Sequence, residues 1–151
     1  MDKENSNNQE RKLHTTRTLN APIDLVWEMW TNPEHIEVWW GPNGFTNTIH
    51  KMDLHENGGW DLTMHGPDGT NYPNRSIFKE IILFEKIVFE HLNPHFITTV
   101  KFETKAEKTV LDWSMLFDTR EMRDSVVKAH KADKGQQENL DKLEKYLANK
   151  V

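Results

Sequence analysis

The chain has 151 residues, a formal net charge of −5 and no cysteine. Its length predicts a single domain, and the missing cysteines exclude disulfide bridges, thiolate zinc sites and thiol catalysis. Acidic and basic residues are interspersed, which argues against a general binder of nucleic acid or of anionic membranes. No apolar run approaches the ~20 residues that cross a bilayer, and the N-terminus lacks the apolar stretch of a secretory signal, so we expect a cytoplasmic protein.

The N-terminal part of the chain changes character after residue 10. Residues 1–10 (MDKENSNNQE) are strongly polar, which predicts a disordered tail ahead of a single domain over residues 11–151. Threonine-rich residues 11–19 favour a β-strand. Proline at position 22 and an acid at position 24 are typical of a helix start, and an apolar face follows at helical spacing, formed by Ile23, Val26, Trp27 and Trp30.

A second short helix is predicted directly afterwards. Asn32-Pro33-Glu34 repeats the start signal, with an N-cap residue, a proline and an acid. Ile36, Trp39 and Trp40 then fall at i, i+3 and i+4, so both tryptophans are predicted in the last turn of this helix. Proline at position 42 cannot continue it.

The middle of the chain is predicted to be β-structure. The clearest strand covers residues 60–65, where Trp60, Leu62 and Met64 alternate with polar residues. Glycine-bearing turns flank it at 55–59 and 66–69. The strands expected in this region cover residues 45–54, 60–65, 76–83, 86–92, 96–104 and 109–117.

The C-terminal part returns to helical spacing. Residues 136–149 carry Leu140, Leu143 and Leu147 on one face, which predicts a long amphipathic helix. The charge-rich segment 119–137 is interpreted as a solvated helix or loop, with a partner-docking segment as the alternative.

Together these elements predict an α+β fold. About seven strands joined by short turns form an antiparallel sheet, and such a sheet must cover its apolar face. The C-terminal helix is the one long amphipathic element available for this. We therefore expect a curved sheet wrapped around that helix, with two short helices after the first strand and a cavity where helix and sheet part.

Several segments of the chain resemble a known family. They are APIDLVWEMWTNPEHIEVWWGP (21–42), MDLHENGGWDLTMHGPDGTNYP (52–73), IFKEI (77–81) and NLDKLEKYL (139–147). In this order they resemble the SRPBCC superfamily of START-like and birch-pollen-allergen-like domains. Within it, the chain is similar to the branch named activator of heat-shock protein 90 ATPase homologue (AHSA-like), over residues 13–147. The resemblance implies a helix-grip fold.

The chain departs from the family pattern at two positions. Ser76 stands where the family usually has glycine, and Gln136 follows Gly135 where the family often has tryptophan. The second departure affects one wall of the family's cavity. The resemblance implies a co-chaperone role only for larger members that carry an additional N-terminal domain.

The candidate site is an apolar cavity between the sheet and the C-terminal helix, for which the alternative is that the same side chains simply fill the core. Adjacent helical residues point about 100° apart, so Trp39 and Trp40 are expected to divide their roles between anchoring the helix and facing the cavity or solvent. The candidate cavity-lining residues are Trp39, Trp40, Phe45, Trp60, Met64, Phe78, Phe89, Phe102, Trp113, Met115, Leu140 and Leu143.

Metal binding is a weaker hypothesis. His91 and His95 flank a turn, and His50, Asp53 and His55 lie close in sequence, but no H-E-x-x-H arrangement places two ligands on one helix face. We expect no metal and no cofactor, with these histidines solvated or placed in hairpins.

Catalysis is the remaining option. A carboxylate held in an apolar cavity can exchange protons with a ligand, and Asp53, Asp61 and Glu80 are the candidates. A strand carboxylate more often faces solvent or an ion-pair partner. The sequence therefore favours binding of a small hydrophobic molecule. A protein–protein module resembling heat-shock ATPase activators, with a chaperone as the possible partner, and a cyclase-, aromatase- or hydrolase-like enzyme remain as alternatives.

Overall fold

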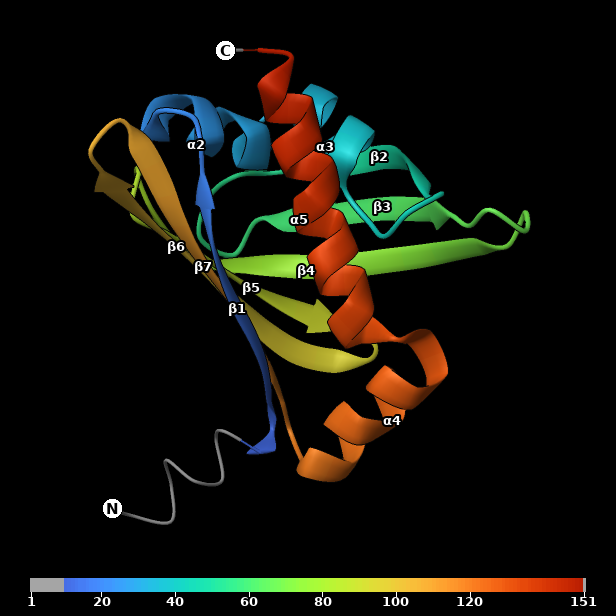
Figure 1. Cartoon of the computed structure of the whole chain (residues 1–151). Helices are drawn as coiled ribbons and strands as arrows, with labels where there is room; N and C mark the ends of the chain where they lie inside the picture. The colour runs from blue at the N-terminus through green and yellow to red at the C-terminus, as the bar shows by residue number, and fades with distance from the viewer. Residues whose placement is uncertain (1–9, 151) are drawn as a thin grey trace, which may run out of the picture.

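The computed structural model describes residues 10–150, so the tail expected over residues 1–10 lies outside the described residues except for Glu10. Residues 10–150 form seven strands and four helices (Figure 1). They are, in order, β1 (Lys12–Leu19), α2 (Ile23–Thr31), α3 (Pro33–Trp39), β2 (Thr46–Met52), β3 (Gly59–His65), β4 (Asn71–Ile82), β5 (Lys86–Leu92), β6 (His95–Lys105), β7 (Lys108–Phe117), α4 (Arg120–His130) and α5 (Ala132–Ala148).

The strands form one curved antiparallel sheet in the order β1-β7-β6-β5-β4-β3-β2. Helix α5 crosses the concave face of this sheet, α2 and α3 cover one end of it, and α4 lies at the other end (Figure 1). The predicted α+β helix-grip architecture is confirmed. Among the described residues, no helix is long and apolar enough to span a membrane.

Burial along the strands follows the predicted alternation. In β3, Trp60 and Leu62 are buried and Asp61 is partly exposed. In β6 every second residue from Phe96 to Phe102 is buried. Side chains of a strand alternate between the two faces of a sheet, so these residues line the concave face that α5 covers.

Helix α3 begins where the sequence predicts, but it ends one residue earlier than predicted. The Asn32 side chain accepts a hydrogen bond from the backbone N–H of Glu34, and Pro33 opens the helix. Trp40 lies outside the helix in extended conformation, so the prediction that both tryptophans occupy the last turn was wrong. The Trp40 carbonyl turns away and accepts a hydrogen bond from the buried Asn47 side chain at 2.8 Å.

Two segments differ from the sequence expectation. Strand β4 begins at Asn71 rather than at residue 76, because the turn at 66–69 brings β3 and β4 into pairing from Asn71 onward. The sequence did not predict this part of the strand because proline, here Pro73, is unusual inside a strand. Segment 119–137 forms a separate helix, α4, and the first turn of α5. Lys131, in a left-handed conformation, divides the two helices.

Candidate functional site

A cavity of about 690 Å³ lies between the concave face of the sheet, the loop after α3, and helices α4 and α5. Its apolar lining comes mainly from strands β3, β5 and β7, which alternate large side chains onto this face. Its larger apolar residues include Trp40, Trp60, Leu62, Met64, Phe89, Trp113 and Met115. Volume and lining are typical of a small-molecule pocket.

The structure divides the candidate residues into two groups. Those that line the cavity are Trp40, Phe45, Trp60, Met64, Phe89, Trp113 and Met115. The others, Trp39, Phe78, Phe102, Leu140 and Leu143, are packed into the core. Which group a residue belongs to depends on where it lies along the concave face. Side chains beneath α2, α3 and the C-terminal part of α5 pack against each other and leave no space.

The tryptophan pair illustrates this division. Trp39 is 1% exposed, and its Nε1 donates a hydrogen bond to the Met29 carbonyl at 2.9 Å, which anchors α3 to α2. Trp40 lines the cavity and stacks on Trp113 at 5.8 Å between ring centroids. The two tryptophans thus differ in environment, with Trp39 bonded to α2 rather than to the sheet and Trp40 at the cavity.

The loop 41–45 is held against α5 by hydrogen bonds from successive turns of the helix. Asn139 Oδ1 accepts a hydrogen bond from the Gly41 N–H, and Glu138 Oε1 accepts one from the Asn43 N–H, both at 3.1 Å. Lys142 Nζ donates to two loop carbonyls at 3.3 Å. Burial lowers the pKa of Lys142. The loop thus forms a fixed wall of the cavity.

Gly41 is required by the geometry of this wall. Its φ is +97°, a conformation that favours glycine. A Cβ atom at this position would lie 2.8 Å from the Cε of Met64. Backbone and thioether therefore meet without a side chain between them.

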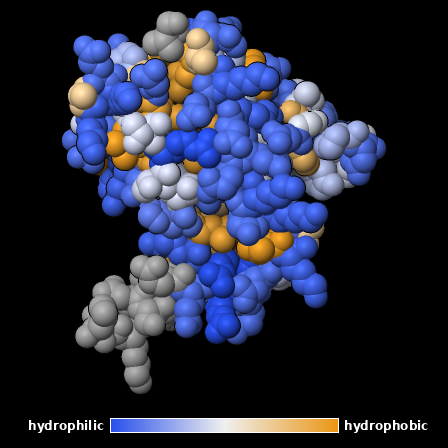
Figure 2. Space-filling model, viewed as in Figure 1, coloured by the Kyte–Doolittle hydropathy of each residue, from blue (hydrophilic) through white to orange (hydrophobic). Residues whose placement is uncertain are grey.

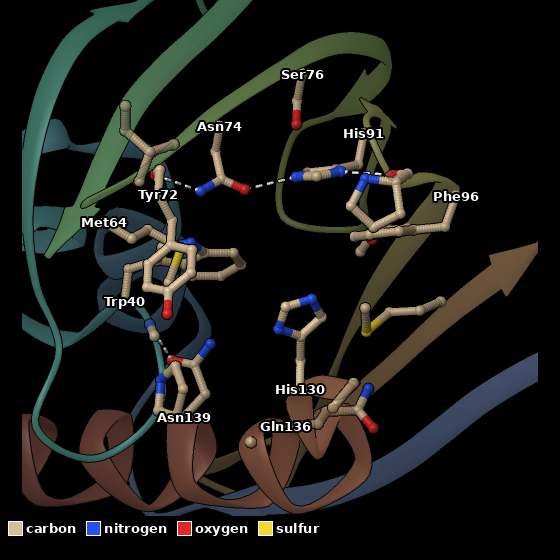
Figure 3. Close-up of a pocket in the computed structure, with 18 of the residues that line it drawn as sticks. Trp40, Met64, Tyr72, Asn74, Ser76, His91, Phe96, His130, Gln136 and Asn139 are labelled. Carbon is tan, nitrogen blue, oxygen red and sulfur yellow. Dashed lines mark hydrogen bonds between the residues drawn. The ribbon is translucent and has the colours of Figure 1, made fainter. Parts of the chain in front are cut away.

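One wall of the cavity is polar and comes from β4 and β5 (Figure 3). Ser76 and His91 are register partners across these strands, and both are buried. His91 Nε2 lies 2.6 Å from Asn74 Oδ1, and His91 Nδ1 lies 2.7 Å from the Pro94 carbonyl. The His91 ring stacks on Phe96 with centroids 4.5 Å apart. Burial lowers the pKa of His91.

Further polar groups come from the helices. His130 of α4 points into the space in front of His91, and Gln136 and Asn139 of α5 line the opposite side (Figure 3). Gln136 Nε2 donates to the Trp113 carbonyl at 3.3 Å. Both positions at which the chain departs from the family pattern, Ser76 and Gln136, lie in this cavity.

Sequence reasoning missed this polar wall. Alternation in β5 places Phe89 and His91 on one face, and the same rule applied to β4 gives Asn74, Ser76 and Phe78. That signal was obscured because His91 was considered only as a possible metal ligand beside the turn.

The candidate catalytic acids do not line the cavity. Each forms an ion pair elsewhere: Asp53 with Lys51 at 3.4 Å, Asp61 with Arg75 at 3.3 Å, and Glu80 with Lys86 at 2.6 Å. Asp61 alternates with Trp60 and Leu62 in β3 and therefore lies on the opposite face from the cavity. In β4 the pairing with β5 shifts register between Phe78 and Glu80, which takes Glu80 out of the alternation of Asn74, Ser76 and Phe78.

The histidines considered as ligands are dispersed as well. His50 contacts the Thr63 hydroxyl at 2.8 Å. His95 bridges Glu90 and Asp118 at 2.8 Å, on the opposite face of the sheet from His91. This pairing raises the pKa of His95, through the hydrogen bond with Glu90 first and that with Asp118 second. Within residues 10–150, no group of three or more His, Cys, Asp or Glu side chains could hold a metal ion.

The family model described as Activator of Hsp90 ATPase homolog 1-like protein (AHSA1) matches residues 20–148. No curated protein sequence matches the chain.

Solved structures share the fold at low identity. A protein from Nitrosomonas europaea is 20% identical with a TM-score of 0.84, covering 95% of this chain and 97% of that one. A protein from Arthrobacter aurescens is 20% identical with a TM-score of 0.87, covering 93% and 88%. The AHSA1 protein from Silicibacter pomeroyi is 16% identical with a TM-score of 0.76, covering 93% and 99%. Identities this low establish the fold alone.

Proposed function

The chain belongs to the family of Activator of Hsp90 ATPase homolog 1-like proteins, and within that family we propose that it binds one small, mainly apolar molecule in the cavity. It does so as a single domain over residues 11–151. The ligand lies between the concave face of the sheet and helices α4 and α5.

The observation that carries this proposal is the lining of the 690 Å³ cavity. Aromatic and thioether side chains provide contact area, and a few fixed polar groups on one wall provide orientation. Pockets of about 300–1,000 Å³ with this composition bury most of a drug-sized ligand. The Trp39 anchor and the α5 hydrogen bonds hold the loop wall in place, so little ordering is needed on binding.

The test is native mass spectrometry of the purified protein together with thermal shift against a panel of lipophilic molecules. A bound ligand raises the melting temperature, because it stabilises the folded state by a free energy that grows with the logarithm of one plus the ratio of its free concentration to Kd. Ala132→Trp places an indole in the cavity from the first turn of α5 and should abolish the shift. Ala148→Trp, at the exposed far end of the same helix, is the matched control and should retain it. A panel without stabilisation and a protein without bound ligand would reject the proposal.

A second candidate function is binding of a chaperone ATPase, as the family description suggests for its namesake. One surface feature favours it: the turn between β4 and β5 exposes Ile82, Leu83 and Phe84, with Leu83 64% exposed. The test is stimulation of a purified Hsp90-class ATPase. Leu83→Asp should abolish stimulation, and Ile97→Asp, at another exposed apolar site on β6, should not. An ATPase rate unaffected by the wild-type protein removes this candidate.

A further inference from the structure

His91 has an unusual environment for a buried histidine. It is 8% exposed, and both of its ring nitrogens face oxygen atoms. Nδ1 lies 2.7 Å from the Pro94 carbonyl, and Nε2 lies 2.6 Å from Asn74 Oδ1. A neutral imidazole carries one N–H, so it can donate to only one of these oxygens, whereas an imidazolium donates to both.

The Asn74 amide cannot resolve this conflict by rotating. Its Nδ2 donates to the Tyr72 carbonyl at 2.9 Å, which directs Oδ1 toward His91. Exchanging the amide nitrogen and oxygen would satisfy His91 Nε2 but would set Oδ1 against the Tyr72 carbonyl. Every neutral arrangement therefore leaves one contact between two acceptors, and only a protonated His91 satisfies the whole network.

The described side chains that line the cavity offer no counter-charge to a protonated His91. Among residues 10–150, no aspartate or glutamate lines the cavity. The titratable groups around His91 are His95, across the turn, and His130, from α4. The Glu90 and Asp118 carboxylates bind His95 on the other face of the sheet. Burial accordingly lowers the pKa of His91 and keeps it neutral without a ligand.

Hydrogen-bond donors without partners line the cavity, one of them directly beside His91 and others on its opposite side. The Ser76 hydroxyl lies in the strand beside His91, is 2% exposed, and points into the cavity (Figure 3). Neither the Ser76 hydroxyl nor that of Tyr72 has a side-chain hydrogen bond within the described part of the chain. The Asn139 amide uses its oxygen on the loop and leaves its NH₂ group available. Such groups fit an acceptor on the ligand.

From this arrangement we propose that the ligand is a carboxylic acid with a flat apolar body, bound as the carboxylate, and that His91 takes up one proton when it binds. This inference rests on the proposed function. The carboxylate accepts a hydrogen bond from Ser76 and neutralises the imidazolium, and the apolar body lies against Trp40 and Trp113. The proton comes from solvent: neutral His91, one H⁺ and the free carboxylate give the imidazolium–carboxylate pair, and no covalent bond changes.

Proton uptake predicts a direction for the pH dependence. The free carboxylate is already ionised above pH ~5, so between pH 6 and 8 the proton must be added to the protein. Affinity then falls as pH rises, approaching tenfold per pH unit above the pKa of free His91. A neutral ligand with the same apolar body shows no such dependence.

The experiment is isothermal titration calorimetry with three probes that share one ring system: 2-naphthoate, 2-naphthamide and 2-naphthylmethylamine. Each is titrated at pH 7 in phosphate and in Tris, whose ionisation enthalpies differ. For naphthoate we expect a Kd at least ~10-fold below that of the amine. We also expect its binding enthalpy to differ between the two buffers by the difference in their ionisation enthalpies, which corresponds to uptake of one proton. For naphthamide we expect the same enthalpy in both buffers.

Variants assign the proton to a residue. His91→Gln should remove proton uptake and raise the naphthoate Kd to that of naphthamide for the same variant. His50→Gln, on the outer face of β2, is the matched control and should behave as wild type. If His91→Gln does not fold, the buffer dependence of the wild-type protein still tests proton uptake.

The outcomes separate this inference from the proposed function. Equal Kd values for acid and amide, or an enthalpy independent of buffer, overturn the inference while ligand binding stands. Proton uptake that persists in His91→Gln overturns the assignment to His91. If the lipophile panel and all three probes fail to bind, the proposed function and this inference are both rejected.

Discussion

The two ends of one concave sheet face are built differently in this protein. Beneath α2 and α3, aromatic rings meet edge to face with no space between them, as in the contacts of Trp30 with Trp39 and with Phe102. At the other end, Trp40, Trp60 and Trp113 border the cavity. Large aromatic side chains therefore do not by themselves close a core, because closure depends on what lies opposite them.

The helices explain the difference. Helix α2 buries Val26, Trp27, Met29 and Trp30, whereas α4 has no buried residue. In α5 the apolar buried residues begin at Leu140, and the preceding buried residues are Gln136 and Asn139. Figure 2 shows hydrophobic residues reaching the surface near the junction of α4 and α5, on a face that is otherwise largely hydrophilic. Helix α4 thus covers its end of the concave face, but its side chains do not fill the space beneath it.

The largest expected effect separates the two ends at adjacent residues. Trp39→Ala should lower the free energy of unfolding by about 3–5 kcal/mol, because it opens a void in the sealed end and leaves the Met29 carbonyl unpaired. Trp40→Ala should cost less than half as much, because its side chain already borders empty space. Urea unfolding measures both. Equal large losses would mean that the two ends are packed alike.

A smaller effect is expected at the boundary between the ends. Asn47 is 5% exposed, and its Nδ2 donates to the carbonyls of Glu37 and Trp40 at the end of α3. Asn47→Ala should cost about 1–3 kcal/mol, because both carbonyls lose their partner. Chemical denaturation tests this, with Asn43→Ala, an exposed loop residue, as the control. A loss no greater than that of the control would show that water replaces Asn47.

The loop wall of the open end should respond to one added methyl group. Gly41→Ala should destabilise by about 1–2 kcal/mol, since alanine is strained at φ +97° and its Cβ displaces the Met64 methyl. Because that methyl moves within the cavity lining, the thermal shift with any ligand should also decrease. Gly69→Ala, at a similar φ but with nothing within 4 Å, isolates the backbone strain. Identical results for the two variants would contradict a role for the Met64 contact.

The smallest effect concerns the ion pairs behind the polar wall. The pKa of His95 is raised in the folded state by Glu90 and Asp118, so its contribution is full below pH ~6.5 and is lost as pH rises through the raised value. His95→Gln should cost ~0.2–1 kcal/mol at pH 6 and little at pH 9. Urea midpoints at the two pH values measure this. His55→Gln, an exposed turn residue, should show no comparable change between them.

Local patterns were sufficient wherever one element determined its own structure. The alternation of Trp60, Leu62 and Met64 predicted strand β3 and its buried face, and Asn32-Pro33 predicted the start of α3. These signals depend on backbone propensity and on the two-residue period of a strand, which need no knowledge of neighbours. The family motifs added the helix-grip architecture, which the structure confirms.

Properties that depend on partners distant in sequence were decided by the tertiary structure. Trp39 and Trp40 are adjacent, yet only the packing of α2 against α3 makes one the anchor and leaves the other at the cavity. Asn74, Ser76 and His91 form one wall because β4 pairs with β5 in a particular register, and the absence of buried α4 residues leaves space in front of it. The sequence by itself determined which residues are large and apolar and on which strand face they lie. The fold decided which of them touch each other and which face an unfilled volume, because filling depends on side chains that other elements supply from the opposite side.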